Sequence, residues 1–383
     1  MAEHSPRSAD APPVPDGYDG PRACDPHEFG AMLDLQNLAL RTLNSRAGEP
    51  PRMPSMGLDW PHVYYPANLD NIRVVTHDGL VVSAVAIAPT TVRTPRGRLE
   101  LGGINGFVTH PAHRRRGLGT AVLHDAHRVM RECGHHIAML GTVSQNYYRR
   151  FGWEMGMRQR SHTLDRANIT LLPPSPHVEI TEDWRSHVAS LTAMYAREPM
   201  GADRDEHYFT LVAQSRADRL LVALRDGEPV AYVAVWQREV LETGGDVVAT
   251  VALLRRVLRD ADDPRASTTD RPPGESTVVT LDIIVPESNE GLAGLLQETG
   301  IPFGQTHHYM IKVINLESLL RALDLSEVEA TPSGDGWRLR RGGRTLAVSE
   351  CELVKLLFGP ERFPDFAPDL FPLDFFQWKL DRM

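Results

Sequence analysis

Residues 106–126 read GFVTHPAHRRRGLGTAVLHDA, and their pattern indicates the class of fold. A β-branched, apolar run ends at His110, and a loop with three consecutive arginines follows it. Gly117 and Gly119 then open a segment whose apolar residues recur at helical spacing. The next stretch, HIAMLGT at 136–142, predicts a short buried strand. Strand, glycine-containing turn, helix and strand in this order indicate an α/β fold with a βαβ-like unit at its centre.

Helical and strand patterns continue on the N-terminal side of this stretch. Residues 28–43 carry apolar side chains at near-helical spacing, which predicts an amphipathic helix. Residues 71–90 contain two β-branched runs around Asp78-Gly79, a dipeptide typical of tight hairpin turns. Residues 1–22 are rich in Pro, Ala, Ser and Asp, and we expect them to form a disordered polar tail.

On the C-terminal side, a weaker version of the same order begins near residue 179. It contains a hairpin turned at Asp226-Gly227, a helix around 247–258 and a strand at 277–285. This similarity suggests a divergent copy of the first segment. From residue 309 the pattern changes, and about 75 residues remain for a small third domain.

Composition narrows the class of protein. The 383 residues include 41 Lys and Arg against 50 Asp and Glu, so the net charge of −9 disfavours general nucleic-acid binding. The three cysteines have no metal-ligand spacing, and a reducing cytoplasm is the expected compartment. No apolar run approaches the roughly 20 residues of a membrane-spanning helix, so we expect no membrane association.

The loop before the central helix has the chemistry of a pyrophosphate site. Glycines at a helix start let backbone N–H groups approach an anion, and the helix dipole favours negative charge there. Arg114, Arg115 and Arg116 can add charge-assisted hydrogen bonds to phosphate oxygens. Neither GxxxxGK[ST] nor GxGxxG is formed, which argues against the common nucleotide motifs. The alternative is a solvated basic turn before a surface helix.

Arg114, Gly117 and Gly119 resemble motif A of the GNAT N-acetyltransferases, R/Q-x-x-G-x-G/A, which binds the pyrophosphate of acetyl-CoA. The resemblance implies acetyl-CoA as cosubstrate, one strand along its pantetheine arm and a loop around its pyrophosphate. The second copy has Gly244-Gly245 but no arginines before them, so one such site per chain is expected. The implied cosubstrate-binding residues are Phe107, Val108, Thr109, Arg114, Arg115, Arg116, Gly117, Leu118, Gly119, Thr120, Val143 and Ser144.

Residues 146–154, NYYRRFGWE, are similar to the YxRFG[YW] element of the enhanced intracellular survival (Eis)-type acetyltransferases. That resemblance implies two GNAT-like mixed-sheet domains, the second degenerate, then a small sterol-carrier-like α+β domain. It also implies a homo-oligomer, commonly a hexamer. The expected parts are therefore a tail at 1–22, a GNAT domain at 23–160, a degenerate copy at 161–308 and a sterol-carrier-like domain at 309–383.

Transfer of an acetyl group to an amine needs a proton donor for the departing thiolate. By the resemblance, this general acid is Tyr148, with Tyr147 as its local competitor, and a phenol with a pKa near ~10 can donate that proton. The resemblance also implies that the terminal carboxylate, at Met383, acts as the base. Asp374 and Asp381 are alternatives in the same tail.

The expected activity is direct acetyl transfer to a primary amine, either a small molecule or a lysine side chain. Carboxylates and an aromatic side chain, at Glu49, Asp59 and Trp60, are conjectured to face that cationic acceptor. The alternative function is a non-catalytic protein that binds acyl-CoA or a lipid. No metal is expected, because the paired histidines have no third ligand at a recognisable spacing.

Overall fold

The computed structural model describes residues 13–41, 55–175, 177–261, 279–288, 290–306, 309–361 and 363–381. These residues divide into two compact units, each with its own sheet. The first unit comprises residues 1–156 and 308–373, and the second comprises residues 157–307 and 374–382. Both units mix helices with strands, so the predicted α/β class with mixed sheets is confirmed.

The sheet of the first unit has the strand order β1-β2-β3-β4-β5-β15-β6. Its neighbours are antiparallel except β4 and β5, which are parallel because the α3 crossover connects them. The predicted hairpin at Asp78-Gly79 joins β2 to β3. The strands are β1 (Tyr18–Ala23), β2 (Ile72–His77), β3 (Leu80–Thr94), β4 (Gly97–Thr109), β5 (Ile137–Gly141), β6 (Glu154–Gly156) and β15 (Tyr309–Val313).

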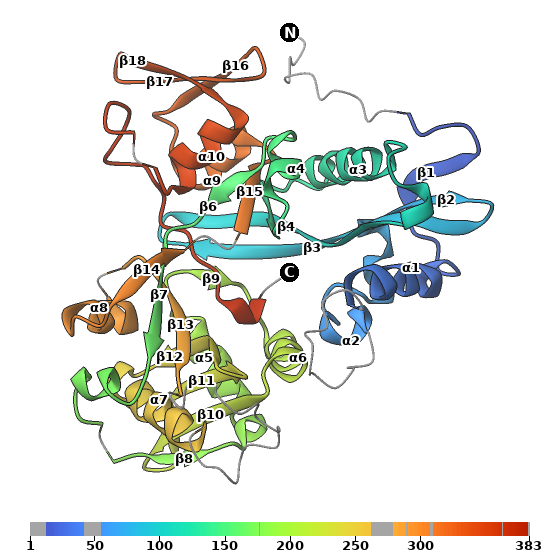
Figure 1. The fold of residues 1–383 in the computed structure, drawn as a ribbon. Helices are drawn as coiled ribbons and strands as arrows, with labels where there is room; N and C mark the ends of the chain where they lie inside the picture. The colour runs from blue at the N-terminus through green and yellow to red at the C-terminus, as the bar shows by residue number, and fades with distance from the viewer. Residues whose placement is uncertain are drawn as a thin grey trace, which may run out of the picture. The chain divides into compact units, whose positions relative to one another are not determined.

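Helix α3 covers one face of this sheet and α1 covers the other (Figure 1). The helical spacing of apolar residues in α3 places Leu118, Val122 and Met130 in one buried cluster with Val85 and Ile87 of β3. The helices of this unit are α1 (Phe29–Gln36), α2 (Met56–Asp59), α3 (Leu118–Glu132), α4 (Gln145–Arg149), α9 (Leu316–Ala322) and α10 (Glu350–Phe358).

Residues 309–373 differ from the predicted third domain because their first strand completes the first sheet. β15 pairs with β5 on one side and with β6 on the other. Helix α10 then packs on β6 and β15, and its Glu350 carboxylate pairs with Lys312 of β15 at 2.7 Å. The remaining strands β16 (Glu329–Ser333), β17 (Gly336–Arg341) and β18 (Arg344–Ser349) form a separate small antiparallel sheet.

The tail predicted over residues 1–22 is wrong for its last part. Strand β1 begins at Tyr18 and pairs antiparallel with β2. Arg22 in this strand also forms an ion pair with Glu28, at 2.7 Å. Composition alone missed this strand because its sequence contains Gly20 and Pro21, residues that are typical of turns.

The second unit has a sheet with the strand order β14-β7-β13-β12-β11-β10-β8. Helix α7 packs against β10, β11 and β12, and α5 also contacts β11 and β12. The strands are β7 (Gln159–Leu164), β8 (Glu179–Thr181), β10 (Arg219–Arg225), β11 (Glu228–Trp236), β12 (Glu239–Gly245), β13 (Leu281–Pro286) and β14 (Phe303–Thr306). The helices are α5 (Val188–Tyr195), α6 (Glu206–Arg216), α7 (Val247–Ala261) and α8 (Gly291–Glu298).

The two units share an order of elements. In the first, the meander β2-β3-β4 is followed by α3 and then by β5, which lies parallel to β4. In the second, the meander β10-β11-β12 is followed by α7 and then by β13, which lies parallel to β12. Helices α3 and α7 each have 15 residues. The two units thus share the order of a three-stranded meander, a helix and a parallel strand.

Candidate functional site

The strands β4 and β5 separate at the centre of the first unit. Their parallel pairing covers only Leu101 to Gly103 on β4, opposite Ile137 to Met139 on β5. Beyond this point β4 continues to Thr109 on β3, and β5 continues to Gly141 on β15. The facing edges of the two strands are no longer paired with each other there, which leaves backbone groups available to an inserted extended molecule.

The N-terminus of α3 lies just beyond the end of β4 and is built to receive an anion. Its N-cap, Gly117, has a φ of 83° and no side chain that accepts a bond from the first turn. A residue other than glycine would be strained in this backbone conformation. The first-turn N–H groups and the positive end of the helix dipole therefore face outwards with no carboxylate on them.

The arginine loop stands beside this helix start. Arg114, Arg115 and Arg116 are all exposed. Arg114 is held by its Nε, which donates to the Thr109 carbonyl at 3.1 Å. Arg115 and Arg116 form no ion pair within the described part of the chain. Two cations without a protein counter-ion, next to an uncapped helix, form a site suited to a phosphate group.

Aromatic side chains close around the same helix start. A Cβ added at Gly119 would lie 3.2 Å from Cζ of Phe107, 3.3 Å from Oγ1 of Thr109 and 3.5 Å from the Tyr147 hydroxyl. Burial raises the pKa of Tyr147, and the Thr120 side chain acts against this rise. The structure thus brings together most of the residues that the sequence assigns to cosubstrate binding. Leu118 contributes backbone only, because its side chain is buried in the core.

Three other predicted binding residues lie on the strand ends and the loop after β5. Val108 is buried within β4. Val143 is fully exposed between β5 and α4. Ser144, the N-cap of α4, is also exposed, and its backbone N–H donates to Thr142 Oγ1 at 3.0 Å. An apolar side chain as open as Val143 at this loop is available to contact a bound molecule.

Tyr148, on α4, is buried in the core beside this region. Its ring centroid lies 6.1 Å from that of Phe107 and 5.2 Å from that of Tyr147. Burial, with a smaller contribution from Tyr147, raises the pKa of Tyr148 well above its usual value. Within the described residues, its hydroxyl has no hydrogen-bond partner. The phenol therefore stays protonated across the physiological range and can donate a proton.

Contacts made by the residues that follow Tyr148 fix the position of this segment. Arg149 forms a bidentate ion pair with the buried Glu154, with contacts of 2.8 and 2.9 Å. The indole N–H of Trp153 donates to Nε2 of His127, at 3.2 Å. Gly152 has a φ of 76°, and a Cβ there would lie 1.7 Å from Oε2 of Glu350 on α10. These contacts fix the helix that carries Tyr147 and Tyr148.

The predicted base, Met383, lies outside the described residues, as does Glu49 of the conjectured acceptor loop. Its alternative Asp381 is fully buried in the second unit. One Asp381 oxygen accepts from Arg204 Nε at 2.7 Å, and the other accepts from the Tyr195 hydroxyl at 2.9 Å. These partners leave Asp381 unsuited to act as a base. Asp374 is more than half exposed and lies 3.6 Å from Arg158.

Sequence reasoning missed a second group of residues, around Gly106 of β4. Gly106 has a φ of 61° and lies next to an irregularity in the β3–β4 pairing. Its carbonyl accepts from Nε2 of Gln36, a fully buried residue of α1, at 2.8 Å. The Tyr64 hydroxyl donates to Oδ1 of Asn105, at 2.7 Å. These contacts fix the backbone one residue before Phe107. In the sequence, the only indication of this group was Gln36, a polar residue on the apolar face of the helix predicted over residues 28–43.

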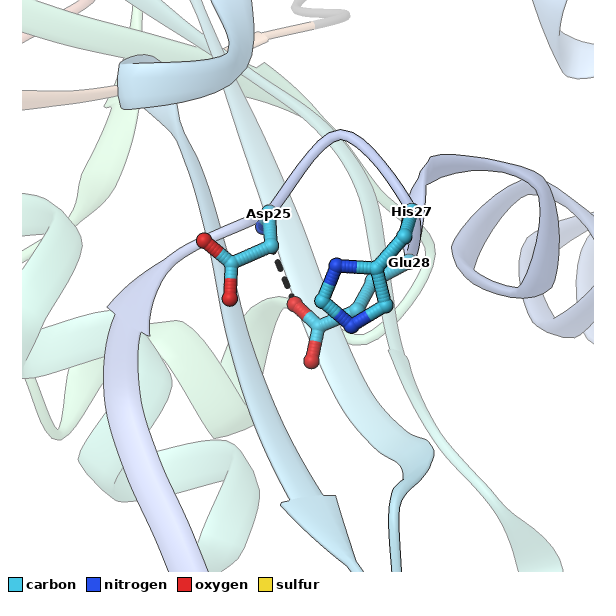
Figure 2. Close-up of side chains that lie close together, drawn as sticks. All are labelled: Asp25, His27 and Glu28. Carbon is cyan, nitrogen blue, oxygen red and sulfur yellow. Dashed lines mark hydrogen bonds between the residues drawn. The ribbon is translucent and has the colours of Figure 1, made fainter.

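A cluster of possible metal ligands lies elsewhere in the first unit. Figure 2 shows Asp25, His27 and Glu28 close together at the turn before α1. Both Glu28 oxygens accept hydrogen bonds from Arg22, at 2.7 and 2.8 Å, and one also accepts from the Asp25 N–H at 2.9 Å. The Arg22 guanidinium and these hydrogen bonds lower the pKa of Glu28. The Arg22–Glu28 ion pair therefore accounts for this cluster, because it connects β1 to the start of α1.

The comparisons with known proteins agree with this geometry. Residues 21–156 match the family model of the acetyltransferase (GNAT) domain. The chain is similar to a conserved protein of Enterococcus faecalis V583 described as a probable N-acyltransferase, with TM-score 0.60 and 14% identity over 86% of this chain and 84% of that chain. It is similar to Eis1 from Mycobacterium abscessus, with TM-score 0.60 and 13% identity over 90% of each chain.

A third similar structure is a GCN5-related N-acetyltransferase from Kribbella flavida, with TM-score 0.55 and 15% identity over 85% of this chain and 83% of that chain. At these identities the similarities show the fold, which is GNAT-like and mixed α/β. The search of curated proteins gives no match. Across the described residues, no helix is both long and apolar enough to cross a bilayer.

Proposed function

We propose that this protein is an N-acetyltransferase that moves an acetyl group from acetyl-CoA to a primary amine within a ternary complex. The observation that carries the proposal is the uncapped start of α3, with its exposed arginines, where β4 and β5 separate. The match of residues 21–156 to the acetyltransferase (GNAT) domain supports acyl transfer as the class of reaction.

In this proposal the pyrophosphate of acetyl-CoA lies on the first turn of α3. The N–H groups after Gly117 donate to it, and Arg115 and Arg116 neutralise its charge. The pantetheine arm extends between β4 and β5 and uses the strand edges that are unpaired there. The thioester then lies near Phe107 and Val108, where a backbone N–H can polarise its carbonyl.

The chemical step is direct attack by the neutral amine on the thioester carbon. A C–N bond forms, the tetrahedral intermediate collapses, and the C–S bond breaks to release the thiolate. Tyr148 donates its phenolic proton to that sulfur, and its raised pKa keeps it protonated until then. The amine gives up one proton in return, so the products are the N-acetylated amine and free CoA thiol.

The terminal carboxylate of Met383 is the proposed acceptor of the amine proton. A carboxylate with a pKa of ~3.3–3.7 is a weak base, so it acts mainly by orienting the ammonium group or a water molecule. The amine acceptor is a small molecule or a lysine side chain.

Further proposals follow from the same resemblance. The second unit is a degenerate GNAT-like copy, and its repeat of strand and helix order supports this. Residues after β15 correspond to a sterol-carrier-like region. The protein is a cytoplasmic homo-oligomer, and the resemblance implies a hexamer. Size-exclusion chromatography with light scattering tests the oligomeric state directly.

The substitution Tyr148→Phe tests the catalytic assignment. We expect turnover, measured as amine-dependent thiol release, to fall by about 10²–10⁴-fold while acetyl-CoA affinity by calorimetry stays unchanged. Tyr147→Phe is the matched variant, because it removes the neighbouring hydroxyl and leaves that of Tyr148. Full turnover in Tyr148→Phe would remove Tyr148 from this role.

A panel of aminoglycosides, polyamines and a lysine peptide identifies the acceptor class. Deleting the last few residues, which displaces the terminal carboxylate from its place at Met383, should lower turnover and preserve acetyl-CoA binding, and full activity after this deletion would exclude the terminal carboxylate as base. Tight acetyl-CoA binding without thiol release for any amine would instead support a non-catalytic acyl-CoA-binding protein.

A further inference from the structure

A cavity of about 220 Å³ lies in the second unit, where β12 and β13 separate. Its walls are the end of β12 at Thr243 to Gly245, the end of β13 at Val285 and Pro286, and the first turns of α7 and α8. Phe376 and Trp378 of the C-terminal segment line another side. All of its lining residues belong to the second unit.

The backbone at this cavity repeats the strand separation of the first unit. β12 and β13 pair only at Glu239 with Asp282 and at Val240 with Ile283. Beyond that point β12 remains on β11, and β13 remains on β7. The facing strand edges are not paired with each other, so their N–H and C=O groups are available to a ligand.

The helix start at this cavity is nevertheless unlike that of α3. The Asp246 carboxylate accepts from the N–H of Ala249 at 2.8 Å, so a negative charge already caps α7. An incoming phosphate would meet this carboxylate instead of free N–H groups. The cavity is therefore unsuited to the pyrophosphate of a CoA ester.

The side chains of the lining favour a cation. Among the described residues of the lining, the charged members are two carboxylates, Glu198 and Glu290. Phe376 and Trp378 also line the cavity, and their rings meet edge to face with centroids 5.1 Å apart. Carboxylates and aromatic rings recognise ammonium groups, and the apolar members of the lining suit a short aliphatic body.

We propose that this cavity is a second ligand site, which binds a small aliphatic ammonium ion and does not bind acyl-CoA. The site is independent of the transfer reaction proposed for the first unit, since every residue that lines the cavity lies in the second unit. Its volume suits an amine of a few carbon atoms, below the range of about 300–1,000 Å³ typical of drug-sized ligands.

Titration of the full chain with 1,4-diaminobutane tests the proposal, with calorimetry and tryptophan fluorescence as readouts. Trp378 lines the cavity, so binding should change the fluorescence, and Trp378→Phe should abolish that change. Glu290→Gln should weaken binding by about tenfold or more, because it removes a charged partner of the ammonium group. Glu290 makes no cap hydrogen bond at the start of α8, so this substitution should leave folding intact.

Two controls make the result specific. Glu228→Gln changes an exposed carboxylate of β11 in the same unit and should leave the affinity unchanged. Butane-1,4-diol has the same length without charge and should not bind. The proposal is overturned if the diamine causes no fluorescence change that depends on Trp378, if Glu290→Gln binds it like the wild type, or if the diol or pantetheine binds as tightly.

Discussion

Gly106 shows how one residue fixes the strand β4 beside the proposed thioester site. Its φ is 61°, and a Cβ there would lie 2.2 Å from both Nε2 of Gln36 and the hydroxyl of Tyr64. Both neighbours are held by other bonds, Gln36 to the Gly106 carbonyl and Tyr64 to Asn105. A side chain at residue 106 would therefore force this buried group apart.

We predict that Gly106→Ala lowers the free energy of unfolding of the first unit by more than about 2 kcal/mol, from backbone strain and steric overlap together. Gly79→Ala is the matched control, since Gly79 also has a positive φ, 76°, but nothing lies within 4 Å of its added Cβ. Thermal unfolding of both variants separates the two costs. If both variants lose the same free energy of unfolding, the contact of the added methyl group with Gln36 and Tyr64 has no energetic cost.

His127 gives the first unit a pH dependence. It is fully buried, accepts the Trp153 N–H, and burial holds its pKa well below the usual value. The unfolded chain protonates this histidine below about pH 6.5 while the folded chain does not. Stability is therefore complete above that pH and falls as the pH decreases, by up to about 1.4 kcal/mol per pH unit.

We predict that His127→Gln reduces this loss of stability between pH 7 and pH 5, because glutamine can accept the Trp153 bond without titrating. Chemical denaturation at several pH values measures the slope. His27→Gln, at an exposed histidine, should leave the slope unchanged. An unaltered slope in His127→Gln would contradict the assignment.

At the scale of elements, α3 and α7 occupy equivalent places but have opposite charge at their starts. Gly117 leaves α3 uncapped beside arginines, whereas Asp246 caps α7 with a carboxylate. This contrast supports a single cosubstrate site per chain.

We predict that the double variant Arg115→Gln, Arg116→Gln weakens acetyl-CoA binding by about tenfold or more and reduces its salt dependence. Arg131→Gln, at the opposite end of α3, is the control and should bind normally. Calorimetry at two salt concentrations measures both effects. Unchanged affinity in the double variant would place the pyrophosphate elsewhere.

The elements themselves were largely predictable from the sequence. The boundaries of α3, α7 and β5 follow the apolar periodicity, and the hairpins follow the Asp-Gly turns at 78–79 and 226–227. Motif spacing also predicted the loop from Arg114 to Gly119. The part played by Gln36 could not be predicted, because its contact with Gly106 joins residues 70 positions apart and no local pattern encodes that contact.

At the scale of the whole molecule, the predicted boundary at residue 309 coincides with the change from the second unit to the first, but the residues after it rejoin the first unit and do not begin a third one. The sequence YMIKV of β15 is typical of any buried strand, and its partners β5 and β6 lie far upstream. Periodicity identifies a strand but carries no information about distant partners. The first unit is thus discontinuous in sequence, a feature that a linear reading of composition and motifs does not reveal.

We predict that a fragment of residues 1–308 fails to form a stable first unit, since β5 and β6 lose the strand between them. Circular dichroism and acetyl-CoA binding measure this, and co-expression with a fragment of residues 309–383 should restore part of both. A fragment of residues 1–308 that binds acetyl-CoA as tightly as the full chain would show that β15 is dispensable.

The place of β15 also sets an order of events during synthesis. Residues 18–156 leave the ribosome first, yet the strands β5 and β6 do not pair with each other. The nascent first unit must therefore wait with two open strand edges while residues 157–308 are translated. Such edges are favoured binding sites for chaperones and for other nascent chains. The rate of translation through residues 157–308 would thus affect how much of the protein reaches its native state.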